Sequence, residues 1–327
     1  MVRQESTLVM LVQSVDTIPL PEPPATPRRG RPIVYSERLF LKALVVMSVK
    51  RLSTVYELLS VLAQDTPEMA ALRPLLTAQG RCPSRRTWER RVAALVATLP
   101  AIIGGLGRHL VDVLAPWQDC ARAAAIDSTV LRAKGGVWHK KDRVAGVVPH
   151  TSIDTEAGWT KSGWHGWVYG WKLHVVCTAG AVGVPLAADL TPAPEADNTL
   201  APALIRELPL ELRFLLGDQH YGDPHLAALC AQRGCHLIVP TGGPYPHTDP
   251  GVEVRRILHK TRSITIENFN EQFKGIFESH QAVPTRGLVA TRRFALGAIF
   301  VYQLTVLQRY HQGADPRAGL KAFLRAA

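Results

Sequence analysis

Two largely apolar runs in the chain each end in an aspartate. Residues 123–126 lead directly into Asp127, and residues 212–217 lead into Asp218. Short apolar runs are typical of strands buried on both faces, and α/β sheets place their chemistry at the carboxyl ends of such strands. Asp127 alone could simply cap the element that follows it. Because the pattern recurs, we interpret the two aspartates as a pair of functional acids.

Alternating and helical patterns connect these two predicted strands. Residues 170–177 alternate in polarity, and 183–190 follow after a glycine-containing turn, which predicts a β-hairpin. Helices are predicted over 195–207 and 224–233 and a short strand over 236–239. The stretch from 130 to 170 is poor in regular pattern. Its tryptophans and lysines suit either a small core under a long loop or stacking on unpaired nucleotide bases.

A helix predicted over 263–279 carries a third acid, Glu267, where it opens. The apolar stripe of this helix faces the core and consists of Phe269, Phe273, Ile276 and Phe277. Glu267 and Lys274 lie two turns apart on the other side, so their side chains point the same way. Glu271 shares that side; it is either a rival third acid or an ion-pair partner of Lys274. A long apolar helix over 292–310 is predicted to pack on the sheet.

Residues 36–118 show helical patterns and no strand pattern. Ser36 and Ser84 stand where helix N-caps are expected. The helix after Ser84 directs Trp88 toward a core, and three of its arginines project on one broad face: Arg85, Arg86 and Arg90. A helix, a turn and a basic helix resemble a helix-turn-helix DNA reader. The alternative is a solvated face on a structural helix.

The charge balance favours the DNA-binding interpretation. The 327 residues are 46% hydrophobic and 20% charged, as in an ordinary folded protein, but the net charge is +11 and the pI about 9.7. Such a protein favours a polyanionic partner, with nucleic acid ahead of an anionic membrane. No segment predicts a membrane span, and the N-terminus lacks a signal-peptide pattern. The five cysteines form no C-x-x-C pair, which indicates buried thiols in a reducing cytoplasm.

These patterns divide the chain into four predicted parts. An extended basic and proline-rich arm covers 1–35, because proline-rich segments favour extended tethers. A helical DNA-binding region covers 36–118, the catalytic domain 119–312 and a basic tail 313–327. Within the catalytic domain, the three separated acids Asp127, Asp218 and Glu267 predict a divalent-metal site, since hard cations prefer carboxylate oxygens.

The predicted order of elements is that of the ribonuclease-H-like fold, an α/β fold with a mixed sheet flanked by helices, here preceded by an all-helical region. Four pieces of the sequence resemble DDE transposases of bacterial insertion sequences, in the group with a YREK signature. The resemblance covers about residues 120–310. Its pieces are Ala-Ile-Asp-Ser-Thr at 125–129, Gly-Trp-Lys-Leu-His at 170–174, Gly-Asp-Gln-His-Tyr at 217–221 and residues 266–274.

The last piece departs from the signature in its first half. The signature places Tyr, two residues, Arg, three residues, Glu, six residues and Lys. Glu267 and Lys274 keep the last interval. Arg262 lies one residue too far from Glu267, and His259 occupies the Tyr position.

The resemblance implies a transposase that cleaves the ends of its element and joins the freed 3′-OH to target DNA. Two Mg²⁺ ions, with Mn²⁺ as an alternative, would be held by Asp127, Asp218 and Glu267 and would serve the attacking and leaving oxygens. Lys274 would hold a phosphate, and Arg262 a second one. Lys172 and His174 share one face of their strand and either touch DNA phosphates or form a solvated strand face.

The partners implied are double-stranded DNA, both the terminal inverted repeats of the element and the target, and a second copy of the chain on that DNA. A cytoplasmic, nucleoid-associated location is expected, with no membrane. Two alternatives use the same fold. One is a DNA-binding repressor or relic without transposition activity, although a relic would be expected to lose an acid. The other is a nuclease, which does not require the helical N-terminal region.

Overall fold

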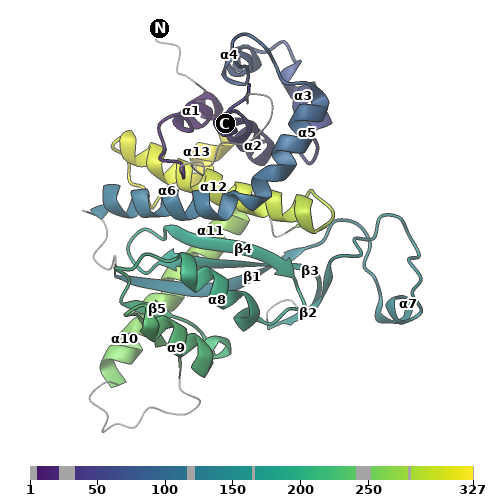
Figure 1. The fold of residues 1–327 in the computed structure, drawn as a ribbon. Helices are drawn as coiled ribbons and strands as arrows, with labels where there is room; N and C mark the ends of the chain where they lie inside the picture. The colour runs from purple at the N-terminus through teal and green to yellow at the C-terminus, as the bar shows by residue number, and fades with distance from the viewer. Residues whose placement is uncertain are drawn as a thin grey trace.

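Six strands form one mixed sheet in the C-terminal part of the chain (Figure 1). The computed structural model describes residues 6–21, 34–115, 122–163, 166–240, 252–278 and 281–326. The strands are β1 (Ala123–Arg132), β2 (Gly158–Ser162), β3 (Gly166–Thr178), β4 (Pro185–Pro192), β5 (Phe214–Leu216) and β6 (His236–Ile238). They lie in the order β2-β3-β1-β5-β6, and β4 also pairs with β3.

The directions of the strands define the fold. β3 pairs antiparallel with β1, β2 and β4, whereas β1–β5 and β5–β6 are parallel. The hairpin expected from the alternating pattern is β3–β4. The order β4-β3-β1-β5-β6, with three antiparallel strands followed by two parallel additions, is the ribonuclease-H-like arrangement. The predicted fold class is therefore confirmed.

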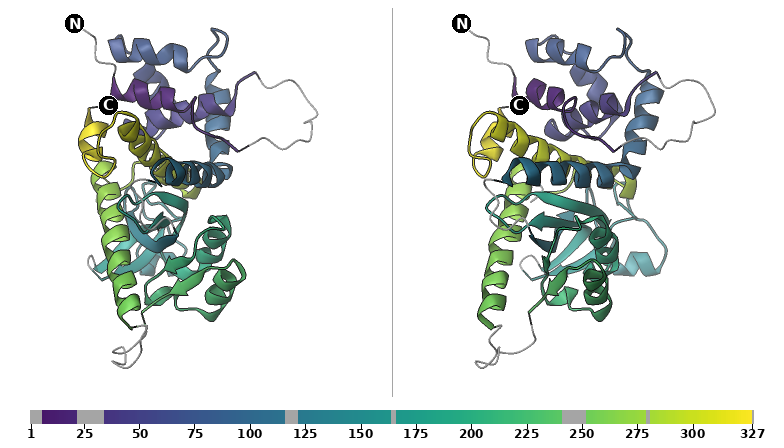
Figure 2. Two further views of the ribbon diagram at one scale, coloured as in Figure 1. Left: turned by 90° about the vertical axis from the view of Figure 1, so that its left-hand side faces the viewer. Right: turned by 60° about the vertical axis from the view of Figure 1, so that its left-hand side comes forward.

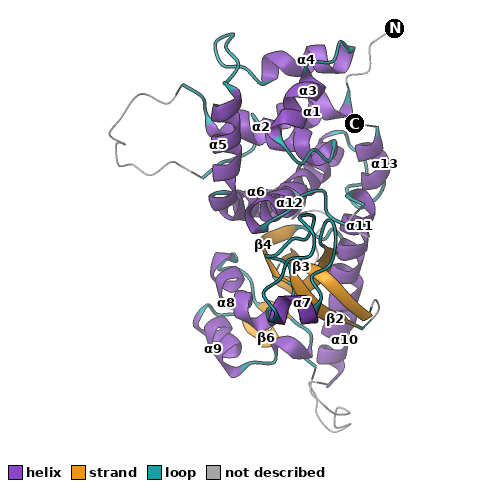
Figure 3. Ribbon diagram, turned by 90° about the vertical axis from the view of Figure 1, so that its right-hand side faces the viewer, coloured by secondary structure: helices purple, strands orange, loops and turns teal. Residues whose placement is uncertain are grey.

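Helices cover both faces of the sheet (Figure 3). Successive side chains of β1 enter two different buried clusters, one on each face. On one face α8 (Asp197–Glu207) and α9 (Pro224–Gln232) pack over Ala124 and Ile126. On the other face runs α10 (Val252–Arg262), continued by the π-helical turn η4 (Ser263–Glu267) and α11 (Asn268–Ile276). These three segments form one long helix beside the sheet (Figure 2).

A layer of helices lies across β4 and joins the two halves of the chain. It contains α6 (Leu99–Val113) and the 24-residue α12 (Leu288–His311), whose middle is buried on all sides. The buried Gln303 amide donates to the carbonyl oxygens of Ile103 on α6, at 2.9 Å, and Pro185 on β4, at 2.8 Å. A Cβ on Gly107 would lie 2.4 Å from the Pro185 oxygen, so α6 approaches β4 closely only because this residue is glycine.

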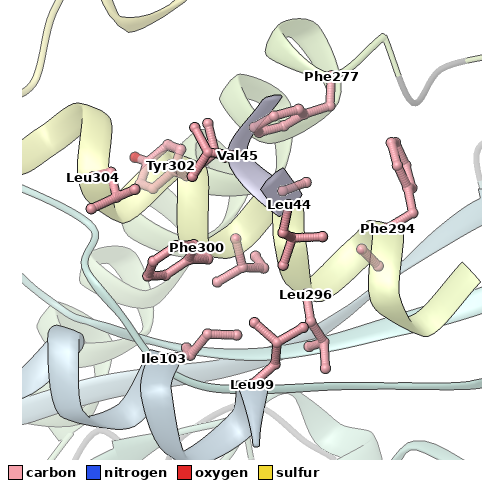
Figure 4. Packing of buried hydrophobic residues seen from close by; sticks show 14 of the residues in the cluster. Leu44, Val45, Leu99, Ile103, Phe277, Phe294, Leu296, Phe300, Tyr302 and Leu304 are labelled. Atoms are coloured by element: carbon pink, nitrogen blue, oxygen red, sulfur yellow. The ribbon is translucent and has the colours of Figure 1, made fainter. Parts of the chain in front are cut away.

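The N-terminal helices pack on this layer and share its core. They are α1 (Thr7–Ser14), α2 (Glu37–Val49), α3 (Val55–Leu62), α4 (Pro67–Leu75) and α5 (Arg85–Ala94), which the short turn η1 (Leu95–Ala97) joins to α6. Figure 4 shows Leu44 of α2 and Ile103 of α6 packed around Phe300 of α12. One buried cluster thus crosses the boundary expected near residue 118, and the helical region and the sheet region stabilise each other.

No single helix among the described residues has the length and apolar character of a membrane span. The bent pair formed by 85–97 and 99–113 meets those criteria only when its two members are taken together.

Several expectations about local structure are wrong. The arm predicted as extended contains α1, whose Leu8, Leu11 and Val12 are fully buried; residues 22–33 of the arm lie outside the described part. The basic tail, for which no secondary structure was predicted, contains α13 (Leu320–Arg325), which buries its leucines. Burial of apolar side chains at helical spacing stabilises these short helices despite the neighbouring prolines and charges.

The stretch from 130 to 170 is more regular than predicted. It holds β2 and the short helix α7 (Lys140–Val144). The indole nitrogen of Trp159 donates to the carbonyl oxygen of Trp138, and that of Trp138 donates to the carbonyl oxygen of Val147, both at 2.8 Å. These contacts fit a small core under a loop, while Trp167 is exposed. Trp164 lies outside the described residues.

Candidate active site

Asp127 lies in the interior of β1 rather than at its end, which corrects the prediction. The last pair between β1 and β5 is Ala125–Leu216, and β1 continues to Arg132 with β3 alone. The side chain of Asp127 therefore stands two residues beyond the point where its parallel neighbour stops. The apolar run ends near Asp127 because β5 no longer pairs with β1 beyond Ala125, although β1 itself continues.

Asp218 follows β5 and is fixed by backbone hydrogen bonds. Its carboxylate accepts the N–H of His220 at 2.8 Å, which caps the single turn η3 (Gln219–Tyr221). The N–H of Gly217 donates to Ile238 on β6 at 3.0 Å. A Cβ on Gly217 would lie 2.9 Å from the Cβ of Tyr221, so the tight turn depends on glycine here.

Asp127 and Asp218 lie close enough for the charge of Asp218 to act on the pKa of Asp127. Burial, the largest cause, and the negative charges of Asp218 and Asp197 together raise the pKa of Asp127 from 3.8 to about 6. The backbone N–H of Ser128 and the Arg262 guanidinium act in the opposite direction. A carboxyl group held near neutrality beside another acid, in a partly covered position, is typical of functional sites.

The long helix brings an amide and an ammonium group to Asp127. The Asn270 side chain donates from Nδ2 to Oδ2 of Asp127 at 3.2 Å. Lys274, one turn further on, is partly buried; burial lowers its pKa, and the carboxylates of Glu271 and Asp127 oppose that shift. Glu267 lies one turn before Asn270 and is exposed. It does not open the helix as predicted but lies within it.

Aromatic packing fixes the rotation of this helix. Phe269, Phe273 and Phe277 are buried, which confirms the predicted stripe. Phe269 packs edge-on against Tyr302 of α12 with ring centroids 5.1 Å apart. With that stripe in the core, Asn270 and Lys274 are directed to the rim where β1 exposes Asp127.

The π-helical turn explains the irregular spacing of Arg262. In an α-helix two residues four apart lie one turn apart, whereas in a π-helix the corresponding separation is five. Arg262 and Glu267 are five apart and flank this turn. The extra residue is thus absorbed, and Arg262 remains on the side of the helix that faces Asp127 and Asp218, where its charge influences Asp127.

The structure brings some of the predicted acids together and leaves one apart. The charge of Asp218 acts on Asp127, whereas Glu267 is not among the groups that shift the pKa of Asp127. Glu267 is linked to Asp127 only because the helix that carries it also carries Asn270, which donates a hydrogen bond to Asp127. Among the described residues, no three His, Cys, Asp or Glu side chains are grouped closely enough to hold a metal ion. Two aspartates with hard oxygen donors and a neighbouring helix that presents a third acid nevertheless form a donor set of the type that Mg²⁺ prefers.

A family model supports this interpretation of the acids. The model described as the transposase DDE domain matches residues 118–304, more than half of the chain. The chain belongs to this transposase family.

Solved structures similar to this transposase domain are distant. One is a cryo-EM structure of the piggyBac transposase synaptic complex with hairpin DNA, at 9% identity, covering 99% of this chain and 76% of that one with a TM-score of 0.39. Another is the Mos1 transposase paired-end complex with the left transposon end, at 13% identity, 90% and 82% coverage and a TM-score of 0.24. No curated protein matches the chain. The fold assignment therefore rests on the sheet order and the family match.

The opposite face of β1 in the transposase domain carries a second polar cluster. Asp197, at the start of α8, accepts hydrogen bonds from Ser128 at 2.8 Å and from the Lys172 ammonium at 3.0 Å. His174 is only 1% exposed and lies 2.9 Å from the Thr191 hydroxyl, and burial lowers its pKa to about 4. His174 is thus unavailable to DNA and Lys172 is occupied, so the expected phosphate contacts of these two residues are not supported.

The basic helix α5 has the expected exposure. Arg85, Arg86 and Arg90 are exposed, while Trp88 is fully buried against Phe40. Ser84 caps this helix by accepting the Thr87 N–H, whereas Ser36 makes no such bond at α2. Arg85 pairs with Glu89 at 2.8 Å, so part of the basic face is internally neutralised.

Two polar residues close to Asp127 were not predicted as part of this region. Asn270 carries a signal that the sequence offers, because it lies three residues after Glu267 on the same side of a helix. Asp197 carries none, since its partners Ser128 and Lys172 come from two other elements and only the strand register brings them together.

Proposed function

We propose that this protein is a DDE transposase that cuts DNA at the ends of a mobile element and joins the freed 3′-OH to target DNA. The observation that carries the proposal is Asp127, a carboxyl group beside Asp218 and in contact with the helix of Glu267, in a chain of the transposase DDE family. The seven-residue interval from Glu267 to Lys274 supports membership of the bacterial YREK group.

Mg²⁺, or Mn²⁺ in its place, is the cofactor that fits these donors. Asp127, Asp218 and Glu267 are the residues that would hold the ions. When bound, divalent ions lower the pKa of a water nucleophile and stabilise the leaving oxyanion. Glu267 is preferred over Glu271 as the third acid, because Glu267 keeps the seven-residue interval to Lys274.

The proposed reaction has two steps, and Lys274 and Arg262 bind phosphate in both. In the first step water attacks the phosphorus at the element end, and the P–O3′ bond breaks to leave a 3′-OH. In the second step that hydroxyl attacks a phosphorus of the target strand and displaces its 3′ oxygen. Lys274 and Arg262, which flank Glu267 on the same helix, hold phosphate oxygens in both steps through charge-assisted hydrogen bonds.

DNA is held over a wider surface. The helical region 36–118 would bind the terminal inverted repeats, with Arg85, Arg86 and Arg90 of α5 on the phosphate backbone. The net charge of +11 favours this partner. The domain 119–312 would carry out catalysis, and a homodimer would bring two ends together. A cytoplasmic, nucleoid-associated location follows from that partner.

The experiment is a strand-nicking and joining assay on DNA that carries the inverted repeats flanking the reading frame. We expect Mg²⁺-dependent nicking at the repeat ends by the wild type and none by Asp218→Asn or Glu267→Gln. Glu271→Gln is the matched control on the same helix and should retain nicking. Binding of the repeats without nicking at any Mg²⁺ or Mn²⁺ concentration would instead identify a DNA-binding relic.

A further inference from the structure

The hydroxyl group of Tyr221 is buried without a hydrogen-bond partner among the described residues. The residue is 1% exposed, and its oxygen contacts no donor or acceptor in that part of the chain. A buried hydroxyl left in this state keeps the full free-energy cost of its removal from water. Native proteins keep such groups mainly where a ligand, an ion or a catalytic role accounts for them.

The ring of Tyr221 is fixed in place by its surroundings. The residue ends η3, and its N–H donates to the carbonyl oxygen of Asp218 at 3.1 Å. Gly217 leaves room for the ring, and Ile126 and Leu226 pack in the same buried cluster. These contacts fix the ring, and the hydroxyl therefore has a defined position.

The charges of three acids act on the Tyr221 hydroxyl. The carboxylates of Asp127, Asp197 and Asp218 all raise the pKa of the Tyr221 phenol, in addition to the larger effect of burial. Two of these acids are the proposed metal ligands. The phenol O–H of Tyr221 is a hydrogen-bond donor. The carboxylates that act on it are those expected to bind a hydrated cation.

We propose that Tyr221 is a positioning residue of the metal site, whose hydroxyl donates a hydrogen bond into the hydration shell of a divalent cation held by Asp127 and Asp218. The inference rests on the proposed metal-dependent function. Mg²⁺ keeps several waters when protein carboxylates bind it, so its shell offers oxygen acceptors to a neighbouring donor. Groups that contact the shell rather than the ion typically change metal affinity 10- to 100-fold.

The test compares two tyrosine-to-phenylalanine variants of the full chain. Tyr221→Phe removes a hydroxyl that has no protein partner. Tyr302→Phe is the matched control, because the buried Tyr302 hydroxyl donates to Gln272 at 3.1 Å, on the far side of the α11 stripe. Mn²⁺ affinity is measured by isothermal titration calorimetry in the absence of DNA, and the metal-free melting temperature is recorded for each protein.

The two variants should behave in opposite ways. Tyr221→Phe should weaken Mn²⁺ binding about tenfold while its metal-free melting temperature stays equal to that of the wild type or rises. Tyr302→Phe should lower the melting temperature and leave Mn²⁺ binding unchanged. If the Phe variant fails to fold, Tyr221→Met, a flexible apolar filler of the same pocket, is measured instead with the same expectation.

Unchanged Mn²⁺ affinity in a folded Tyr221 variant would overturn this inference alone, provided that the wild type binds Mn²⁺ and Asp127→Asn does not. Absence of Mn²⁺ binding by the wild type would overturn both the inference and the metal part of the proposed function. The two failures are therefore distinguishable.

Discussion

The two faces of β1 carry acids in opposite circumstances. On one face Asp127 has an amide donor, Asn270, and its burial, together with the charge of Asp218, raises its pKa to about 6. On the other face Asp197 has a lysine ammonium at 3.0 Å and a hydroxyl at 2.8 Å. An acid with a full set of protein partners holds elements together, whereas an acid left beside other acids is a candidate for an ion or a substrate.

A third acid near this strand supports the distinction. Asp189 on β4 accepts two hydrogen bonds from the Arg292 guanidinium of α12, the longer at 2.7 Å. This pair joins the sheet to the helical layer. Asp189 and Asp197 thus have basic partners within the protein, and this contrast supports the proposal that Asp127 and Asp218 form the site.

The largest expected effect is on catalysis. Asp127→Asn should reduce nicking of inverted-repeat DNA by more than about 100-fold, beyond the loss typical of groups outside the first shell of a metal. Asp197→Asn should reduce it by less than about tenfold, because Asp197 acts only through the position of Lys172 and Ser128. Single-turnover nicking rates at saturating Mg²⁺ measure both. Equal losses in the two variants would remove the distinction between the two faces.

Asp127→Asn should raise the free energy of unfolding at neutral pH, although it lowers nicking activity. A folded-state pKa of about 6 against an ordinary 3.8 means that the folded protein binds the proton more tightly than the unfolded chain. The contribution of this group to stability is complete below about pH 4 and is lost as pH rises to 6, which amounts to roughly 3 kcal/mol. In metal-free buffer, Asp127→Asn should therefore be more stable than the wild type at pH 7.5.

Urea unfolding of both proteins at pH 7.5 and pH 4 measures this difference. It should be large at pH 7.5 and close to zero at pH 4. A variant less stable than the wild type at pH 7.5 would show that the Asp127 charge is satisfied in the folded protein.

Asp197→Asn should destabilise the protein. The change leaves the Lys172 ammonium, whose side chain is 13% exposed, without its carboxylate partner. A loss of about 1–3 kcal/mol is expected, less than for a fully buried pair. Thermal unfolding with the exposed Asp65→Asn as control tests this expectation, and a melting temperature equal to that of the control would contradict it.

The smallest effect is expected for a deletion in the π-helical turn. Removing Ile264, which is 55% exposed, should convert η4 to a regular α-helical turn and keep Arg262 facing the site. Nicking should stay within about threefold of the wild type, because one α-turn then replaces one π-turn. Arg262→Ala is the comparison, with a clear loss expected. An inactive deletion variant would contradict this equivalence and show that the extra residue of the π-helical turn is needed.

The sequence was informative where a single element carried the signal. The apolar runs before Asp127 and Asp218, the β3–β4 alternation and the Phe269–Phe273–Phe277 stripe each follow from local spacing, and all appear in the structure. The position of Asp127 inside β1 could not be predicted in this way. The apolar run stops where the pairing with β5 stops, and no pattern within β1 indicates how long a neighbouring strand is.

The polar alternation of β3 misled for a related reason. Lys172 and His174 resemble a solvated strand face, yet α8 covers that face and supplies Asp197. The partners of a polar residue on a strand come from distant segments, so the sequence identified the residue types but not their environments. The π-helical turn was equally invisible, although the extra residue between Arg262 and Glu267 marked its place.

The central claim is that Asp127 and Asp218 bind a divalent cation. Crystals of the full chain grown with Mn²⁺, measured at the manganese absorption edge, test it most directly. We predict an anomalous difference peak in contact with both carboxylates, with Glu267 turned toward it from the neighbouring helix. A peak elsewhere, or none at these carboxylates in Mn²⁺-saturated crystals, would contradict the account.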